Sequence, residues 1–174
     1  MVGDRRLDLV CLGLGYMSEL LIRAQIKVIL EAVTGIGAVH DYPRTPRSMA
    51  DFFNLMKSAG IVNGVAFTRG SFANAHKTLG HSTVLGTVTT YKQRSHRYVF
   101  AGIREVKDAG ASMNTLQLLL DNIGDAFDGN LTLNGTADFH DLFQLNACYY
   151  SEPGEYGDDI YHLWEAELTV NERR

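Results

Sequence analysis

Cysteine and proline are both scarce in this chain of 174 residues, which contains two cysteines and three prolines. Cys11 and Cys148 are too few and too isolated for a disulfide framework or a cysteine-based zinc site, so the sequence predicts two buried free thiols. A hydrophobic share of 45% with few prolines is typical of an ordinary folded domain and excludes a disordered or fibrous chain.

Long apolar runs are also missing. No stretch approaches the roughly 20 uninterrupted apolar residues of a membrane-spanning helix, because Arg23, Lys27 and Glu31 interrupt the longest candidate. The short run Leu9–Leu14 contains Gly13 and is followed by no small-residue cleavage signal, so we expect no secretion signal. The sequence predicts a soluble protein with no membrane partner.

The motifs that usually carry catalysis are absent. The chain has no Gly-x-Ser-x-Gly elbow, no phosphate-binding loop and no paired catalytic carboxylates, and its six histidines form no i, i+4 pair on an expected helix. His40 and His140 each precede an aspartate, but adjacent side chains of a strand point to opposite faces, so neither pair predicts a dyad. We expect no enzymatic activity, no metal and no cofactor.

One segment resembles a dinucleotide-binding fingerprint. The apolar run from Leu9 leads into Gly-x-Gly-x-x-Ser, in which Gly13 would make the turn, Gly15 would admit a pyrophosphate and Asp41 would bind a ribose hydroxyl. Ser18 replaces the residue that allows close helix–strand packing, and the chain after residue 60 lacks further strand–helix–strand units. A small NAD-binding enzyme is therefore the less favoured alternative.

Charge is distributed unevenly along the chain, although the net charge is only −4. Residues 69–107 contain seven lysines and arginines and one acid, whereas residues 121–172 contain twelve acids and neither lysine nor arginine. Such segments are ordinarily solvated strand faces and loops. They would also allow identical subunits to meet basic side to acidic side, or allow the acidic part to face DNA and repel it.

Apolar side chains at helical spacing predict three helices. The first begins near Ser18 and ends at Gly35, the second follows Ser48 and ends near Gly60, and the third runs from Ser112 to about Phe127. Their expected buried positions are Ile22, Ile26, Ile29 and Val33; Met49, Phe52, Phe53 and Met56; and Met113, Leu116, Leu120, Ile123 and Phe127.

Alternating patterns predict strands between and after these helices. A short strand is expected over Ile36–Tyr42, antiparallel hairpin strands near Val65 and Tyr98, and two strands after the third helix, the last with His162, Trp164 and Val170 on its buried side. Strands that follow one another without intervening helices indicate an α+β fold, with an antiparallel or mixed β-sheet flanked by about three α-helices. We expect an N-terminal arm over residues 1–17 and a single domain over residues 18–172.

A basic run, Lys92–Tyr98, lies on one of the expected strands. Basic residues with aromatic neighbours can bind nucleic acid, but a lone strand in an acidic protein favours a solvated or subunit-facing edge. We therefore interpret Lys92, Arg94 and Arg97 as a candidate basic contact face.

The order of segments carries a family resemblance. It rests on the motif Gly-Ile-Gly-x-Val-His-Asp-Tyr at residues 35–42 after the first helix, followed in order by Arg44, Phe52–Leu55, Asn63–Arg69, His96–Phe100, Gly102, Ser112–Phe127 and Ala166–Val170. Over about residues 20 to 171 the chain resembles small bacteriophage proteins of the tail-terminator and tail-completion class.

This resemblance implies a structural virion protein of the tail or neck, assembled in the host cytoplasm. It implies a ring of six identical subunits at the head-proximal end of the tail tube, which ends tube polymerisation and joins the tail-tube protein to a head–tail connector or stopper. Genomic DNA would pass through the lumen without specific binding, because carboxylates supply no cations for phosphates. Another neck component, such as a connector or stopper ring, is the alternative.

The segment Gly70–Ser82 is rich in glycine, serine and histidine, and we expect it to be a long loop between two antiparallel strands. It also contains Phe72 and Leu79, apolar residues that a solvated linker would not need. The hypothesis is that this loop is mobile in the free subunit and orders on a neighbouring ring, with Phe72 or Leu79 as the anchor and Lys77 beside it. The alternative is a loop that folds back over its own sheet.

Overall fold

The computed structural model describes residues 14–42, 46–82, 87–107, 109–152, 154–156 and 159–173, with side chains except at 14–18, 78–82, 87–91 and 109. Its elements are, in chain order, α1 (Leu14–Glu31), β1 (Ala38–His40), α2 (Met49–Met56), β2 (Lys57–Ser58), β3 (Ile61–Ser82), β4 (Thr87–Glu105), α3 (Ala109–Asp128), β5 (Phe139–His140), β6 (Gln144–Tyr150) and β7 (Tyr161–Arg173). The α+β class predicted from the sequence is confirmed.

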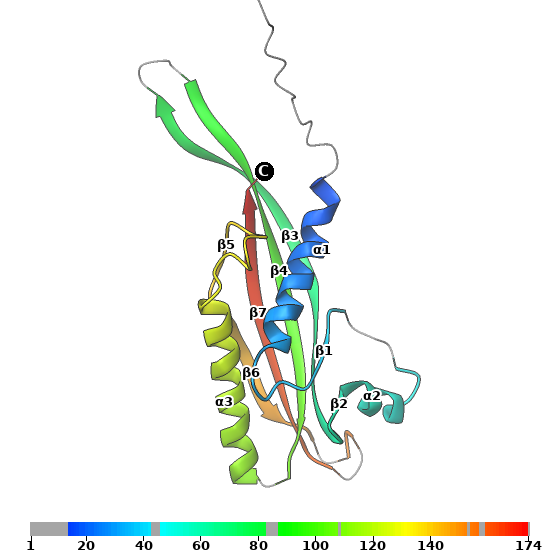
Figure 1. The fold of residues 1–174 in the computed structure, drawn as a ribbon. Helices are drawn as coiled ribbons and strands as arrows, with labels where there is room; N and C mark the ends of the chain where they lie inside the picture. Colours follow the sequence, from blue (N-terminus) through cyan, green and yellow to red (C-terminus); the bar gives the residue numbers. More distant parts are fainter. Residues whose placement is uncertain are drawn as a thin grey trace, which may run out of the picture.

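The strands form one mixed seven-stranded sheet. The main order is β1-β3-β4-β7-β5, with β2 paired to β3 and β6 paired to β7. The β1–β3 pair is parallel and the other pairs are antiparallel. The long strands β3, β4 and β7 run side by side through the molecule, with α1 in front of them and α3 at their left in Figure 1.

The main core lies between the sheet and these two helices, so we call this side of the sheet the helix face. Phe67, Phe100 and Leu168 point from three neighbouring strands toward Ile26 of α1 and Ile123 of α3, and all five side chains are buried. The helical spacing of the first and third helices and the alternation of the last strand are therefore confirmed by the packing, with Met113 only half-buried.

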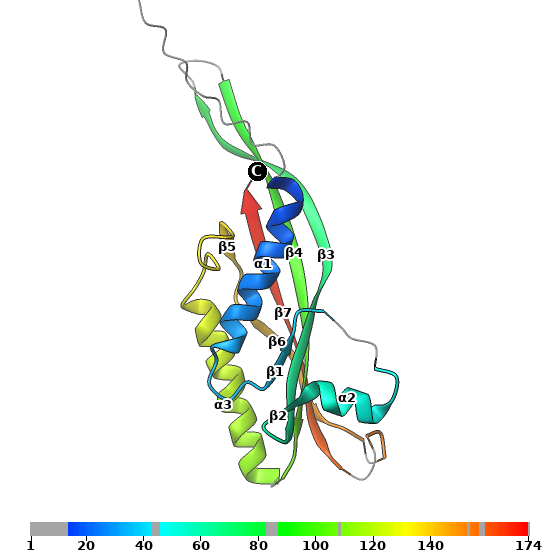
Figure 2. The same cartoon turned by 45° about the vertical axis from the view of Figure 1, so that its right-hand side comes forward.

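A smaller cluster lies on the opposite side of the sheet, which we call the open face. Val62, Ile103, Tyr161 and Leu163 form its buried part, and Phe52, Phe53, Met56 and Tyr156 pack against them while partly exposed. The prediction that the second helix has a fully buried face is therefore wrong. α2 is short and covers only one end of this face (Figure 2), so none of its residues is buried.

The ends of the helices differ from expectation in two places. α1 begins at Leu14, so Leu14–Met17 belongs to the helix rather than to an N-terminal arm, and residues 1–13 lie outside the described part. Ser48 caps α2 as predicted, since its Oγ accepts a hydrogen bond from the Asp51 N–H at 3.2 Å. However, α2 ends at Met56, because the chain enters β2 at Lys57 instead of continuing to Gly60.

The long loop predicted at Gly70–Ser82 is instead the second half of β3, which pairs with β4 up to Ser82. The register shifts between Arg69 and Ser71 and again between Thr78 and Gly80. Gly70 and Gly80, the two glycines that suggested a loop, therefore lie at irregularities where the ladder accommodates an extra residue. The glycines bend a continuous strand and do not end it.

The hairpin of β3 and β4 continues past the third strand. β4 pairs with β7 only from Gln93 onward. Before Gln93, residues 87–92 of β4 pair with β3 alone, from Lys92 opposite His76 to Thr87 opposite Ser82. We call this extension, residues 76–82 and 87–92, the β-ribbon. It projects beyond the rest of the sheet, next to the C-terminal end of β7 (Figure 1).

A substitution at Gly102 of β4 tests the packing of the helix face. A Cβ at this position would lie 1.9 Å from the indole of Trp164, so we expect Gly102→Ala to lower the free energy of unfolding by about 1–3 kcal/mol or more. Gly124, inside α3, has no heavy atom within 4 Å of an added Cβ apart from its own helix backbone, so Gly124→Ala should raise the free energy of unfolding by up to about 1 kcal/mol. Urea unfolding of both variants measures the two effects, and equal stabilities would contradict this packing.

Candidate interaction surfaces

Phe72 lies near the base of the β-ribbon, on the helix face opposite His96. Phe72 is 55% exposed. Two guanidinium groups lie near its ring, with Cζ of Arg69 at 5.2 Å and Cζ of Arg94 at 5.7 Å from the ring centroid. Arg94 is held there by donating from Nε to Oδ1 of Asn74 at 3.0 Å. The structure thus places Phe72 outside the buried core, on a strand and not on a loop.

The other two residues of the predicted docking loop also lie on β3. Lys77 is exposed and pairs in register with Tyr91, within the β-ribbon. The side chain of Leu79 lies outside the described part of the chain. Phe72 and Lys77 therefore have the exposure that a docking segment requires.

The three residues of the candidate basic contact face do not share one face. Lys92 and Arg94 alternate with Ser95 and Arg97 along β4, so Arg97 points to the open face while the other two point to the helix face. Arg97 donates from Nε to Oε2 of Glu167 at 2.8 Å. The pKa of Glu167 is lowered mainly by this hydrogen bond from Arg97.

Neighbouring strands of one subunit explain part of the uneven charge. β4 carries the arginines and β7 carries the carboxylates, and Arg94 lies directly opposite Glu172 in the antiparallel register, with 3.7 Å between Nε and Oε1. Together with the Arg97–Glu167 pair, this places basic and acidic segments side by side within the monomer. Lys77 and Lys92 have no ion-pair partner among the described residues.

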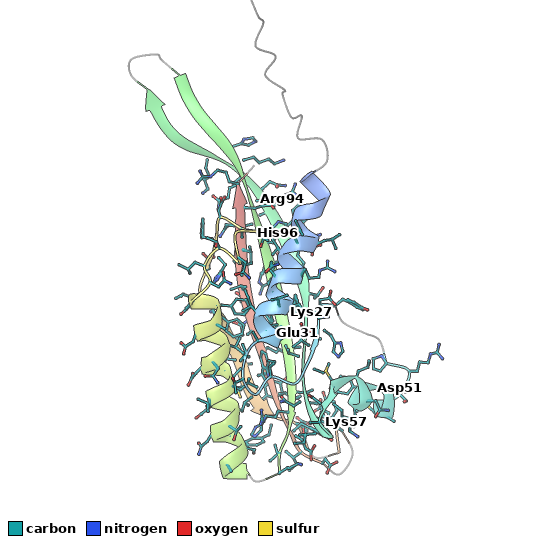
Figure 3. All side chains as sticks on the ribbon, viewed as in Figure 1. Lys27, Glu31, Asp51, Lys57, Arg94 and His96 are labelled. Carbon is teal, nitrogen blue, oxygen red and sulfur yellow. The ribbon has the colours of Figure 1, made fainter. Side chains whose placement is uncertain are left out.

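His96 is buried beside this ion pair. Its side chain is 0% exposed, its Nε2 lies 3.5 Å from Oε1 of Glu172, and neither ring nitrogen has a hydrogen-bond partner among the described residues. Figure 3 shows Arg94 and His96 near the C-terminal end of β7, at the level where β3 and β4 continue into the β-ribbon. Burial lowers the pKa of His96, and Glu172 offsets this only in part.

Two further buried histidines contact groups of the chain itself. His162 is buried, with Nε2 2.9 Å from the Ser112 hydroxyl, and burial followed by the charge of Arg104 lowers its pKa. His140 contacts main-chain carbonyl oxygens of Asp141 and Phe127, at 2.6 and 3.0 Å. Within the described residues, no group of three histidines, cysteines or acids is arranged to hold a metal ion.

The dinucleotide fingerprint has a poor structural setting. Gly15 lies in the first turn of α1, whereas Gly13 and the apolar run before it fall outside the described residues. Asp41 follows β1, which pairs with β3 in parallel, whereas the other described strand pairs of the sheet are antiparallel. Dinucleotide sites of this kind occur at the carboxyl ends of parallel strands, and this sheet is built differently.

β6 forms the opposite edge of the sheet from β1 and β3. None of its seven residues is buried, and Leu145, Tyr149 and Tyr150 are each more than 40% exposed. Cys148 of this strand is an exposed free thiol, so the expectation of a buried one is wrong for it, and Cys11 lies outside the described residues. An edge strand with exposed apolar side chains is a common interaction surface.

A pocket of about 320 Å³ is hollowed into the open face. Its floor is one cross-strand row, in which Ala66 and Ala101 lie between His40 of β1 and Glu165 of β7. Phe52, Leu55 and Met56 of α2 also line it, together with the aromatic residues Tyr149, Tyr156 and Trp164. Sequence reasoning missed this pocket because its residues come together only through the register of four strands.

No protein-family model matches the chain, and no curated protein is similar to it. In the part of the chain that the structure describes, no helix is long and apolar enough to cross a membrane.

The buried His96 predicts a pH dependence of stability. Because its pKa is lowered in the folded state, the unfolded chain binds more protons as the pH falls through the ordinary value of 6.5, and stability decreases on acidification. We expect His96→Gln to lose less stability than the parent between pH 7.5 and 5.5 in urea unfolding. The exposed His76→Gln is the control, and an unchanged slope in His96→Gln would contradict the buried neutral imidazole.

Proposed function

We propose that this chain is a structural subunit of a bacteriophage tail, of the tail-terminator type. Six copies would close into a ring at the head-proximal end of the tail tube, end tube polymerisation and join the tube to the head–tail connector. The segment order described above supports this family, and the α+β architecture agrees with it.

The β-ribbon is the observation that carries the proposal. A two-stranded ribbon without a third strand or a covering helix is only marginally stable in water. Over residues 87–92, which precede Gln93, the described part of β4 has β3 as its only neighbouring strand. The outer edge of β3 has no partner strand from Phe67 to Ser82 among the described residues. Such an extension is stabilised when it packs against another subunit or a neighbouring ring.

The two edges of the sheet support ring closure. A cyclic assembly uses heterologous contacts, in which two different surfaces of the same subunit meet. One edge consists of β1 and β3, and the other consists of β5 and β6, with Leu145, Tyr149 and Tyr150 of β6 exposed. The chain thus has two dissimilar edges that identical copies can bring together.

The acidic segment suits a channel for DNA. Asp121, Asp125 and Asp128 of α3 are all exposed, and their spacing of four and three residues places them along one ridge of the helix. A lumen lined by such carboxylates offers phosphates no cation, so DNA passes without being held. The proposal is that α3 faces the lumen, with Lys77 and Lys92 directed toward other subunits.

The proposed ring gives a direct measurement. Mass photometry of the purified chain should show a species near six times 19.3 kDa, and negative-stain images should show six-fold rings. The ring should dissociate partly in 1 M salt, where the Debye length falls to about 3 Å and exposed charge pairs are screened.

The matching functional test uses the tail-tube protein of the same phage. Tubes that polymerise in its presence should be shorter than tubes formed alone, with this chain found at one end by gold labelling. A chain that stays monomeric both alone and with tubes would overturn the proposal. A ring that binds the connector but not the tube would assign it to another neck component.

We also predict that the chain binds no NAD. Gly15 lies in the first turn of a helix on a mainly antiparallel sheet, which does not present a helix N-terminus to a cofactor as a parallel sheet does. Calorimetric titration with NAD and NADH should give no saturable heat. Saturable binding at micromolar concentration would replace the structural proposal with an enzymatic one.

A further inference from the structure

We infer that the pocket on the open face binds an organic cation, a guanidinium, amidinium or primary ammonium group on an apolar stem. Tyr149 of the pocket also lies on the β6 edge that the proposed ring uses, whereas the cation is held by groups of the pocket itself, so this inference does not require the proposed function. It rests on the shape of the pocket floor, the hydrogen-bonding character of its polar groups and its aromatic walls.

The floor of the pocket is hollow because its side chains are small. The row across four strands reads His40, Ala66, Ala101 and Glu165, and it continues to Ala147 of β6. Neighbouring strands are about 4.8 Å apart, so about 14 Å of strand surface separates the His40 and Glu165 positions. Two methyl groups cover the space between them, which leaves room for an apolar stem lying flat on the sheet.

The two polar residues at the ends of this row are hydrogen-bond acceptors. His40 Nε2 lies 2.8 Å from the carbonyl oxygen of Leu55, which can only accept, so Nε2 carries a proton, and in the tautomer with this single proton Nδ1 is an acceptor. Glu165 is exposed, has alanines as its cross-strand neighbours, and has no ion-pair partner among the described residues. A ligand that fits both ends must donate hydrogen bonds, and a positively charged donor makes the stronger pair with the Glu165 carboxylate.

Aromatic walls favour the same class of ligand. Phe52 of α2 and Tyr156 stack across the space between their elements, with ring centroids 6.1 Å apart. Tyr149 of β6 lines the pocket next to β7, the strand that carries Glu165, and is 46% exposed. The faces of aromatic rings attract cations, most strongly where water is excluded. A planar amidinium or guanidinium can pair with the Glu165 carboxylate while its stem contacts these rings.

A matched pair of small molecules tests this inference. Benzamidine and benzamide have nearly the same shape, but only benzamidine carries a positive charge. In a titration of the ¹⁵N-labelled full chain, both should shift the amides of Ala66, Ala101 and Glu165, and benzamidine should bind at least about tenfold tighter, since hydrogen bonds to charged groups are the stronger ones. Equal affinities, or shifts confined to other parts of the chain, would overturn the inference.

Variants separate the role of the carboxylate from that of the cavity. Glu165→Gln keeps the shape of the side chain and should reduce the affinity for benzamidine to that for benzamide, whereas Asp125→Asn, an exposed acid on α3, should change neither. Ala101→Leu should fill the floor and abolish binding of both molecules while the chain stays folded by circular dichroism. Unchanged benzamidine affinity in Glu165→Gln would show that the carboxylate does not hold the cation.

Two capped amino acids then identify the source of the natural cation. If N-acetyl-arginine methylamide or its lysine counterpart binds as tightly as benzamidine, the pocket receives a basic side chain of a partner protein. If both bind much more weakly, the site serves a free small-molecule amine or amidine. Failure of all the cationic probes to bind below millimolar concentration would reject the cation site and leave the ring proposal untouched.

Discussion

The central strand β4 is the constraint on which the rest of this molecule depends. It is hydrogen-bonded to β3 along one side over 18 residue pairs and to β7 along the other over 13 pairs. Its even-numbered residues from His96 to Phe100 supply the floor of the main core, and Gly102 makes room there for Trp164. Its odd-numbered Ala101 forms the floor of the pocket on the open face. A shift of one residue in this register would exchange the two faces and remove both the core and the pocket.

The same register decides how charge is used. Arg94 and Arg97 of β4 look in sequence like one basic patch, but the pleat of the strand directs them to opposite faces. There each meets a carboxylate of β7, Glu172 on the helix face and Glu167 on the open face. Lys77 and Lys92 of the β-ribbon and the three aspartates of α3 are among the exposed charges that have no ion-pair partner within the described residues. Part of the uneven charge along the chain is therefore neutralised within the monomer, and part of it remains on the surface.

Sequence patterns predicted the elements whose burial is periodic. The stripe from Ile22 to Val33 and the alternation from His162 to Val170 each face one continuous core, so local spacing contains the information needed. The segment Gly70–Ser82 was interpreted wrongly as a loop because a glycine at a bulge and a glycine in a turn look the same in sequence. The pocket was not predictable at all, since His40, Ala66, Ala101 and Glu165 lie far apart in the chain and meet only through pairing across four strands.

The two faces of the sheet have different tasks because the helices are divided unequally between them. α1 and α3 cover the helix face with long apolar stripes, whereas α2 has eight residues and covers only one end of the open face. The uncovered alanine row could have been filled with large side chains, as the neighbouring row is by Ile103 and Leu163. Small residues at this place leave the exposed Glu165 beside an apolar floor, with no ion-pair partner among the described residues. The main core is buried under α1 and α3 on the helix face, so the open face does not need large side chains in this row.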